Sequence, residues 1–248
     1  MINIILSGCG GHMGRNVIDV TEKIDDVTVV AGVDPFCTDD LGFPCYSSFG
    51  EVAEDADVII DFSHHSLTND LLDFAIGRNI PLVIATTGQT DEEKDAIYNA
   101  SKDIPLFFAS NYSLGVALLI EMAKKVAAAM PEAEIEIVEA HHDRKLDAPS
   151  GTALSIAEAI QEVRKDATIH NGRAGNGKRT PEEIGIHAIR MGNIVGIHEV
   201  MVGTQNQTIT LKHEAHSRAL FAEGAVSAAK FVIGKPSGLY TMKELAKF

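Results

Sequence analysis

The sequence NIILSGCGGHMG, at residues 3–14, decides the fold of the chain. Its apolar first part is typical of a buried strand, and its glycines stand where a helix is expected to begin. Gly8 permits a tight turn, and Gly14 lets the helix pack close to the strand. Gly11, or the adjacent Gly10, lets the backbone approach a phosphate, and the helix N-terminus adds free N–H groups. The stretch therefore predicts a phosphate-binding turn.

The spacing of these glycines is G-x-x-G-x-x-G. Because the commoner dinucleotide motif is G-x-G-x-x-G, a glycine-rich turn in another kind of α/β protein remains an alternative. Asp34 strengthens the prediction, since it ends a β-branched run 20 residues after Gly14, where an acid binds the adenosine ribose. A simple turn aspartate is the alternative for Asp34. Together the two features predict a Rossmann-type domain that binds a dinucleotide.

The residues around Asp34 favour NADH over NADPH. Pro35 follows directly, and no Lys or Arg lies in the next few residues to meet a 2′-phosphate. His12 and Arg15, at the start of the first expected helix, could still reach that phosphate. We therefore expect NADH as the preferred cofactor, with NADPH possible.

Strand-like and helix-like segments alternate through the first hundred residues. Apolar runs separated by amphipathic segments are typical of a parallel sheet with helices on both faces. We expect strands at residues 3–7, 27–33, 58–61, 82–85 and 106–109, and helices at 12–24, 67–78 and 91–101.

The pattern changes after residues 111–114. The run EIEIVE alternates polar and apolar residues, which is typical of a strand with one solvated face. We expect helices at 115–130 and 153–164, a basic glycine-rich loop at 170–181, antiparallel strands at 184–191, 194–202 and 208–213, and a helix at 218–233 that returns to the first domain.

The expected fold class is therefore α/β, with two domains. Residues 1–112 and 217–248 are expected to form a Rossmann-type, doubly wound parallel sheet that binds the dinucleotide. Residues 113–216 are expected to form a smaller α+β domain with a mixed, largely antiparallel sheet.

The composition excludes several classes of partner. Among 248 residues the formal net charge is −14, which repels nucleic-acid backbones and anionic lipids. No apolar run approaches the ~18–20 residues that span a bilayer. The three cysteines are odd in number, form no CxxC and follow no signal peptide, so we expect a reduced, cytoplasmic protein. An anionic substrate would need a local basic site.

Small polar residues follow the fourth expected strand, at the edge where open α/β sheets bind ligands. Thr86, Thr87 and Gly88 would let a flat ring lie against the backbone there. Phe62 occupies the corresponding place after the third strand. A helix cap is the alternative for the two threonines.

The segment EAHHDRKLDAPSGTA, at residues 139–153, concentrates basic side chains in an acidic protein. His141, His142 and Lys145 stand close together in a loop that runs into a helix. The first turn of that helix, preceded by Ser150, Gly151 and Thr152, offers N–H groups and hydroxyls to a carboxylate.

The two histidines have three interpretations. Adjacent histidines can bind a metal, but no Cys, Glu or third His stands at a familiar spacing, so we expect no metal site. They can also be ordinary loop histidines. The functional interpretation is a proton donor beside a cation, because histidine gives up a proton near neutral pH and lysine holds a carboxylate.

The same segment resembles the E-A-H-H-x-x-K-x-D-x-P-S-G-T-A signature of the dihydrodipicolinate reductases. This block is highly specific, whereas the glycine block alone is not. Matching blocks run through nearly the full chain: G-x-G-G-x-M-G at 8–14, A-T-T-G at 85–88, A-x-N-Y-S at 109–113, I-R-x-G-x-I-V-G-x-H at 189–198, and Arg218 with residues 221–225 and 238–240.

The resemblance implies reduction of 4-hydroxy-tetrahydrodipicolinate to tetrahydrodipicolinate by NAD(P)H with loss of water, in lysine and diaminopimelate biosynthesis. It implies a homotetramer built through the second domain, and closure of the domains on substrate. His141 would be the general acid and Lys145 its partner. Substrate would be bound by Thr87, His142, Lys145, Ser150, Gly151 and Thr152. The cofactor would be bound by Gly8, Gly11, His12, Met13, Gly14, Asp34, Phe62, Ala85, Thr86, Gly88, Ala109, Tyr112 and Arg218.

Two departures from the family pattern concern the cofactor alone. His12 stands where many members have arginine, and Pro35 stands where NADPH-tolerant members have a basic residue. Other functions remain open from the sequence. An aspartate or homoserine dehydrogenase shares the two-domain plan, and a dinucleotide sensor would bind NADH without oxidising it.

Overall fold

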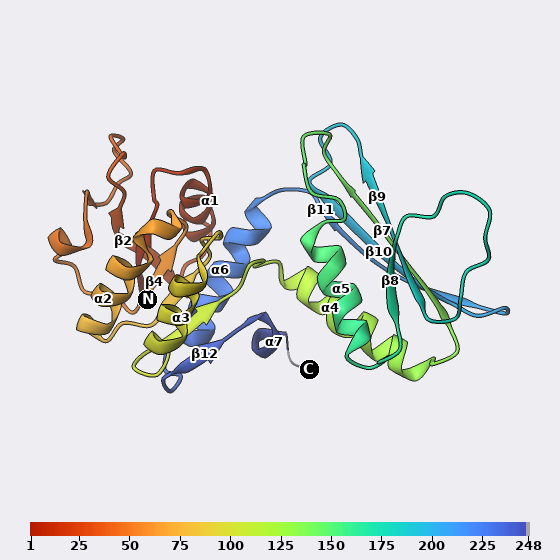
Figure 1. Ribbon diagram of the computed structural model, residues 1–248. Coiled ribbons are helices and arrows are strands. Elements are labelled where there is room, and N and C mark those ends of the chain that lie inside the picture. Colours follow the sequence, from red (N-terminus) through yellow and green to blue (C-terminus); the bar gives the residue numbers. More distant parts are fainter. Residues whose placement is uncertain (247–248) are drawn as a thin grey trace. The chain divides into compact units, whose positions relative to one another are not determined.

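The computed structural model describes residues 1–246, which form two compact units (Figure 1). The first comprises Met1–Ser113 together with the chain from Arg218 onward. The second is the continuous segment Leu114–Ser217. Within residues 1–246, no helix is both long enough and apolar enough to cross a membrane.

The first unit is built on a parallel sheet in which, among the described residues, seven strands pair in the order β3-β2-β1-β4-β5-β6-β12. The order reverses direction at β1, which is the doubly wound arrangement predicted from the glycine turn. The strands are β1 Ile2–Ser7, β2 Val27–Val33, β3 Cys45–Tyr46, β4 Val58–Asp61, β5 Leu82–Ile84, β6 Pro105–Phe108 and β12 Gly238–Tyr240.

Helices cover both faces of this sheet. One face packs Ile5, Ile59 and Leu82 against α2 and α3. On the other face, Phe107 of β6 meets Phe231 of α6 edge to face, with the ring centroids 6.1 Å apart, and α6 also contacts α1. The helices are α1 His12–Thr21, α2 Thr68–Arg78, α3 Asp91–Ala100, α6 Ala219–Val232 and the short α7 Met242–Leu245. The expected return of the chain to the first sheet is thus made by α6 and β12.

Helix α6 approaches the segment that follows β6 more closely than a side chain would allow. A Cβ atom at Gly224 would lie 1.6 Å from the carbonyl oxygen of Tyr112. Tyr112 is itself fixed, because its hydroxyl donates a hydrogen bond to the Ile84 carbonyl at 2.7 Å. Neither partner can move without disturbing the sheet.

We therefore expect Gly224→Ala to destabilise the protein by about 3 kcal/mol, the upper end of the usual cost of overpacking. Urea unfolding followed by circular dichroism measures the change. Gly77→Ala in α2 is the matched control, because a Cβ atom there meets nothing within 4 Å. Equal stability of the two variants would contradict the packing argument.

The second unit contains a mixed sheet, as predicted. Within Leu114–Ser217 its strand order is β11-β10-β7-β9-β8, with β10 antiparallel to both neighbours and β9 parallel to both of its own. The elements are α4 Leu114–Ala129, β7 Glu134–His141, α5 Gly151–Gln161, β8 Thr168–Asn171, β9 Glu183–Arg190, β10 Gly196–Gly203 and β11 Thr208–Ala215.

Two expectations for this sheet were wrong. The strand expected at 184–191 runs parallel to β7, because α5 and then the long loop after β8 carry the chain back to the same end of the sheet. Residues 170–171, expected in a loop, belong to β8. Alternation of polar and apolar residues reveals a strand but carries no information on its direction.

Helices α4 and α5 cover one face of this sheet. Leu119 of α4, Ile156 of α5 and Ile137 of β7 belong to the resulting core. Along β10, residues that face this core alternate with residues on the opposite face of the sheet, and the latter are only half-buried. This amphipathic pattern places Glu139 and His198 on the helix-covered side of the sheet.

Candidate active site

The glycine turn after β1 leaves no room for side chains. Gly8 has a φ of +76°, and a Cβ atom on it would lie 2.5 Å from the Phe62 carbonyl oxygen. A Cβ atom on Gly14 would lie 2.2 Å from the Gly8 carbonyl oxygen. The turn therefore brings α1 close to β1 and presents bare backbone at the helix N-terminus, which is the shape that a pyrophosphate requires.

A cavity of about 190 Å³ lies beside this turn, lined in part by Gly11, Asp34 and Phe36. The carboxylate of Asp34 accepts hydrogen bonds from the backbone N–H groups of Gly10 at 3.0 Å and Phe36 at 2.9 Å. Each carboxylate oxygen can accept more than one hydrogen bond. Asp34 is therefore held in place and can still bind ribose hydroxyls.

A second cavity, of about 340 Å³, opens at the ends of β5 and β6. Met13, Ala85, Thr86, Thr87 and Tyr112 line it. Phe62, Ser63 and His64 line both cavities, so the two adjoin along the carboxyl edge of the sheet. An elongated ligand with a phosphate at its centre fits this arrangement, so the residues present fit a dinucleotide.

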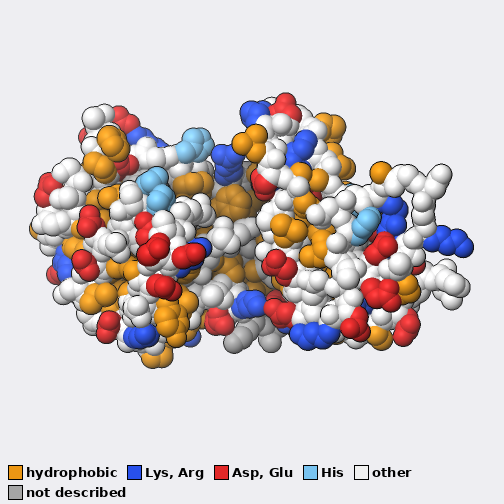
Figure 2. Space-filling model, in the orientation of Figure 1, with side chains coloured by type: hydrophobic (Ala, Val, Ile, Leu, Met, Phe, Trp, Pro, Cys, Tyr) orange, Lys and Arg blue, Asp and Glu red, His pale blue; other side chains and the backbone are white. Residues whose placement is uncertain are grey.

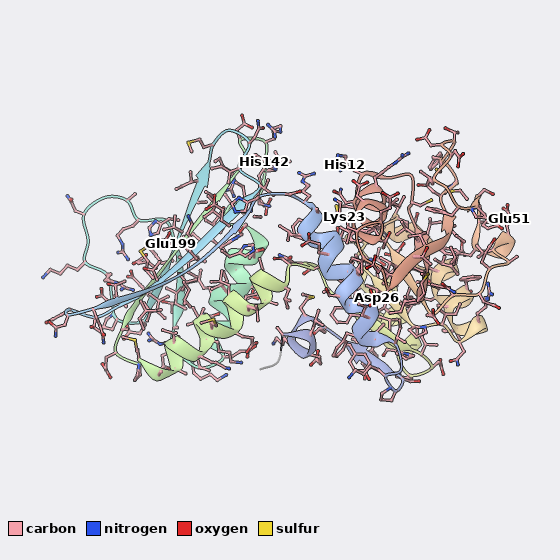
Figure 3. All side chains as sticks on the ribbon, turned by 180° about the vertical axis from the view of Figure 1, so that it is seen from behind. His12, Lys23, Asp26, Glu51, His142 and Glu199 are labelled. Atoms are coloured by element: carbon pink, nitrogen blue, oxygen red, sulfur yellow. The ribbon has the colours of Figure 1, made fainter. Side chains whose placement is uncertain are left out.

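Other predicted cofactor residues lie outside the linings of these two cavities. His12, the first residue of α1, is exposed (Figure 3). Arg218 is the residue before α6, while Gly88 and Ala109 follow β5 and β6. Tyr112, in contrast, lines the second cavity; it is nearly fully buried, and burial raises the pKa of its hydroxyl, which therefore remains a neutral donor.

Asp61 is a site residue that the sequence analysis missed. It ends β4 and is buried, and it accepts hydrogen bonds from the Ser63 hydroxyl at 2.5 Å and the Ser63 N–H at 3.2 Å. Burial raises the pKa of this carboxyl. Asp61 thus fixes the loop that separates the two cavities. Its position at the end of an expected strand is the sequence feature that could have indicated this role.

In the second unit, a buried carboxylate organises the His–His–Lys loop. Glu139 has no exposed side-chain surface and forms a two-point ion pair with Arg190, each N–O distance being 2.8 Å. It also meets the Nδ1 atom of His141 at 2.6 Å. Burial alone would raise the pKa of Glu139, but hydrogen bonds from Arg190 and His141 outweigh it and lower that pKa. Glu139 is therefore a fixed anion.

His141 is oriented by this anion. Because Glu139 occupies Nδ1, the Nε2 atom of the ring remains for another partner. A Cβ atom at Gly196 would lie 3.2 Å from Nε2, so the glycine leaves space beside that atom. In this position the ring is held at Nδ1 by Glu139 and can give a proton through Nε2.

His198 connects the sheet to the start of α5. Its Nε2 atom lies 3.0 Å from the Ser150 hydroxyl oxygen, and its ring centroid lies 5.2 Å from that of His141. Burial, assisted by the neighbouring His141, lowers the pKa of His198 to about 4. His198 is therefore neutral at physiological pH and does not compete with His141 as a proton donor.

Ser150 is fully engaged by the protein. Its N–H donates to Glu139 at 3.0 Å, and its hydroxyl accepts the N–H of Ala153 at 3.2 Å as the cap of α5. Gly151, the first residue of α5, is exposed, and Thr152 follows it. The first turn of the helix therefore presents its backbone, while Ser150 holds the helix to Glu139.

Lys145 and His142 complete the loop. The Nζ atom of Lys145 lies 2.8 Å from a carboxylate oxygen of Asp147, which lowers the pKa of Asp147. His142 is the first residue after β7 (Figure 3). Over the face in Figure 2, acidic and basic side chains are interspersed. The basic character of the loop is thus local, as an anionic ligand of an acidic protein would need.

Glu139, Arg190 and His198 were not predicted as site residues. All three lie within sequence blocks that match the resembled family, so the signal was present. Their roles depend on pairing across β7, β9 and β10, where His141 lies opposite Arg190 and Glu139 lies opposite His198. Such pairing cannot be read from local spacing.

Known proteins share both units. Residues 2–112 match the family described as dihydrodipicolinate reductase, N-terminus, and residues 115–245 match dihydrodipicolinate reductase, C-terminus. The chain belongs to the dihydrodipicolinate reductase family. The resemblance found in the His–His–Lys loop is therefore confirmed over nearly the whole sequence.

Several relatives in this family align from end to end. The 4-hydroxy-tetrahydrodipicolinate reductase of Caldanaerobacter subterraneus subsp. tengcongensis is 48% identical over 100% of this chain and 99% of its own. That of Clostridium novyi is 42% identical over 100% and 99%. A dipicolinate-bound dihydrodipicolinate reductase from Paenisporosarcina sp. TG-14 has a TM-score of 0.83 at 26% identity, covering 97% of each chain.

Proposed function

We propose that this chain reduces 4-hydroxy-tetrahydrodipicolinate to tetrahydrodipicolinate, with a hydride from NAD(P)H and loss of water, in lysine and diaminopimelate biosynthesis. The observation that carries the proposal is His141, held by the buried Glu139–Arg190 pair at the start of the basic loop of a dihydrodipicolinate reductase. An imine nitrogen that receives a hydride on its carbon needs a proton, and this arrangement provides one.

In the mechanism, NAD(P)H when bound supplies the hydride. His141 is the general acid, because Glu139 holds Nδ1 of its ring and leaves Nε2 for the substrate. Lys145 supports it as a cation beside the reacting group. Placing the donor in advance avoids the cost of orienting it during the reaction.

The substrate carboxylates would be held by the loop and the first turn of α5. We assign His142, Lys145, Gly151 and Thr152 to this role, with Thr87 from the first unit. Lys145 must exchange Asp147 for a substrate carboxylate, which costs little because Asp147 is exposed. Ser150 acts through its backbone and hydroxyl as the cap of α5, so we assign it to positioning. The name of the Paenisporosarcina relative, which records bound dipicolinate, supports a dicarboxylate.

We propose that NADH is the preferred cofactor. Asp34 and Pro35 line the smaller cavity and offer no cation to a 2′-phosphate. Arg15, which the sequence left as a candidate for binding that phosphate, forms an ion pair with Asp39. The cofactor residues proposed here are Gly8, Gly11, His12, Met13, Gly14, Asp34, Phe62, Ala85, Thr86, Gly88, Ala109, Tyr112 and Arg218.

Releasing Arg15 should improve the use of NADPH. We expect Asp39→Asn to lower the KM for NADPH by up to about 5-fold, the equivalent of about 1 kcal/mol for an exposed ion pair. The KM for NADH should stay unchanged. Asp40→Asn removes the same charge from the neighbouring position and is the control. Equal effects on the two cofactors would show that Arg15 does not meet the 2′-phosphate.

The second unit also supports a homotetramer. The sheet face opposite α4 and α5 carries half-buried Val138, Ile197 and Met201, and Glu199 lies on the same face (Figure 3). These apolar side chains, interspersed with charged ones and not covered by α4 or α5, are suited to contact a second copy of the same surface. We place the assembly in the cytoplasm.

A charge in this face should weaken the assembly. We expect Met201→Glu to shift the molar mass, measured by light scattering after gel filtration, from a tetramer to smaller species. Exposed Glu182→Gln, before β9, serves as the control. A tetrameric Met201→Glu variant would place the interface elsewhere.

A coupled assay tests the function directly. Pyruvate, aspartate semialdehyde and the pathway synthase generate the substrate, and loss of reduced-nicotinamide absorbance is followed after adding this protein. Rapid oxidation that depends on the protein is expected. Folded protein that binds NADH but oxidises none would overturn the proposal and favour another dehydrogenase or a dinucleotide sensor.

A further inference from the structure

All three cysteines of the chain come together in the first unit. The Sγ atoms of Cys9, Cys37 and Cys45 lie within 4.8 Å of one another, and those of Cys9 and Cys45 are 3.2 Å apart. They come from three segments: the glycine turn, the loop after Asp34, and β3. All three are free thiols. Such convergence of sulfur atoms is not required by the dinucleotide fold.

We propose that this three-thiol cluster is a binding site for a thiophilic metal ion such as Zn²⁺. Zinc binds thiolate sulfur at about 2.3 Å, so sulfurs on a tetrahedral ion lie about 3.8 Å apart. The sulfurs of the cluster need shifts of less than about 1 Å to reach that geometry. Three protein ligands leave a fourth position for water. No metal was expected from the sequence, in which the three cysteines form no CxxC.

Two glycines make the space that the sulfurs occupy. A Cβ atom at Gly32 would lie 2.5 Å from the Sγ of Cys9. A Cβ atom at Gly10 would lie 3.3 Å from the Sγ of Cys37. Gly32 lies opposite Cys45 in the pairing of β2 with β3, so the backbone on each side of the cluster is fixed by the sheet. The cluster is therefore built by the fold.

A disulfide is the main alternative use of these thiols. Formation of a Cys9–Cys45 disulfide would need an oxidant such as a peroxide and a thiolate to attack it. Cys9 is buried, which keeps such an oxidant from its sulfur. A metal ion displaces the thiol protons as it binds, and the net charge of −14 favours a cation.

The three-thiol cluster is connected by the backbone to residues that line the smaller cavity. Cys9 stands between Gly8 and Gly10, and Cys37 follows Phe36, which lines the smaller cavity. A bound ion would tie these segments to β3 and restrict the movement of the pocket wall. The proposal itself does not depend on catalysis, and its test measures metal binding.

Cadmium titration of the full-length, reduced protein tests the proposal, because sulfur-to-cadmium charge transfer absorbs in the ultraviolet and histidine ligands do not produce it. We expect one equivalent per chain to saturate the band. Cys37→Ser and Cys45→Ser should each weaken cadmium binding by more than about 10-fold, because changing a residue that only supports a metal ligand already costs about that much. Zinc should compete for the same site.

Thr38→Ala, an exposed change beside Cys37, is the control and should bind cadmium normally. Circular dichroism confirms that each serine variant is folded. Absence of the band in folded wild-type protein would overturn the proposal. So would a band that survives both serine variants. Loss of two thiols under mild peroxide together with no cadmium band would assign the cluster to disulfide chemistry instead.

Discussion

A His141→Gln variant is expected to lower kcat by about 10²–10⁴-fold, the usual contribution of a positioned general acid. Glutamine keeps the size and polarity of the side chain but has no proton to give. Binding of NADH, measured by fluorescence titration, should be unchanged, because the cofactor cavities are lined by residues of the first unit. Steady-state kinetics in the coupled assay provide kcat.

His170→Gln is the matched control for this change. His170 is an exposed histidine on β8, outside the hydrogen-bond network of Glu139. It should retain wild-type kcat. If His141→Gln also retained wild-type kcat, the assignment of His141 as the proton donor would be wrong, even if the chain proved to be a reductase.

A Glu139→Gln variant is expected to lower kcat by about 10²-fold, which is the lower end of the range for general acid catalysis. Glu139 does not contact the substrate in this proposal. It acts by orienting His141. Without that negative charge the ring is no longer held at Nδ1 by an anion, so kcat should fall while the KM for NADH stays unchanged.

The KM for NADH and the circular dichroism spectrum separate positioning from general damage to the structure, since general damage would change them as well. Glu183→Gln, which removes another ion-paired carboxylate of the same unit, is the control. A wild-type kcat for Glu139→Gln would remove Glu139 from the mechanism.

The same variant should also be less stable. Arg190 would lose its charged partner, and breaking a buried pair costs about 3–5 kcal/mol. We expect about 3 kcal/mol, since 18% of the Arg190 side chain remains exposed to water. Because the pKa of Glu139 is lowered in the folded state, its stabilisation is present above its ordinary pKa of 4.5. That stabilisation is lost as the pH falls through the lower, folded-state value.

Local sequence predicted the first sheet well because most of its strands are apolar runs between amphipathic segments. The strands β3 and β12 were missed, since each has only two or three residues. Cys45 is part of a strand because it lies opposite Gly32 in the sheet. Such pairing depends on the tertiary fold, and no local pattern of residues reports it.

The residues of the site were predicted better than the contacts between them. Loop composition was enough to propose His141 and Lys145. It did not reveal that Ser150 caps α5 and binds Glu139, because both contacts require the helix and strand to be in place. Arg190 lies 51 residues from Glu139 in the chain. Likewise, the three cysteines appeared unrelated until the fold brought their sulfur atoms together.

The interrupted chain path of the first unit has a consequence for synthesis on the ribosome. Leu114–Ser217 emerge as one continuous segment and can fold while α6 and β12 are still being made. The unit that contains the N-terminus therefore finishes second. Until β12 arrives to pair with β6, that strand is an unpaired sheet edge. The nascent chain is thus most open to aggregation, and to chaperone binding, at β6 and at the surface of α1 that α6 later covers.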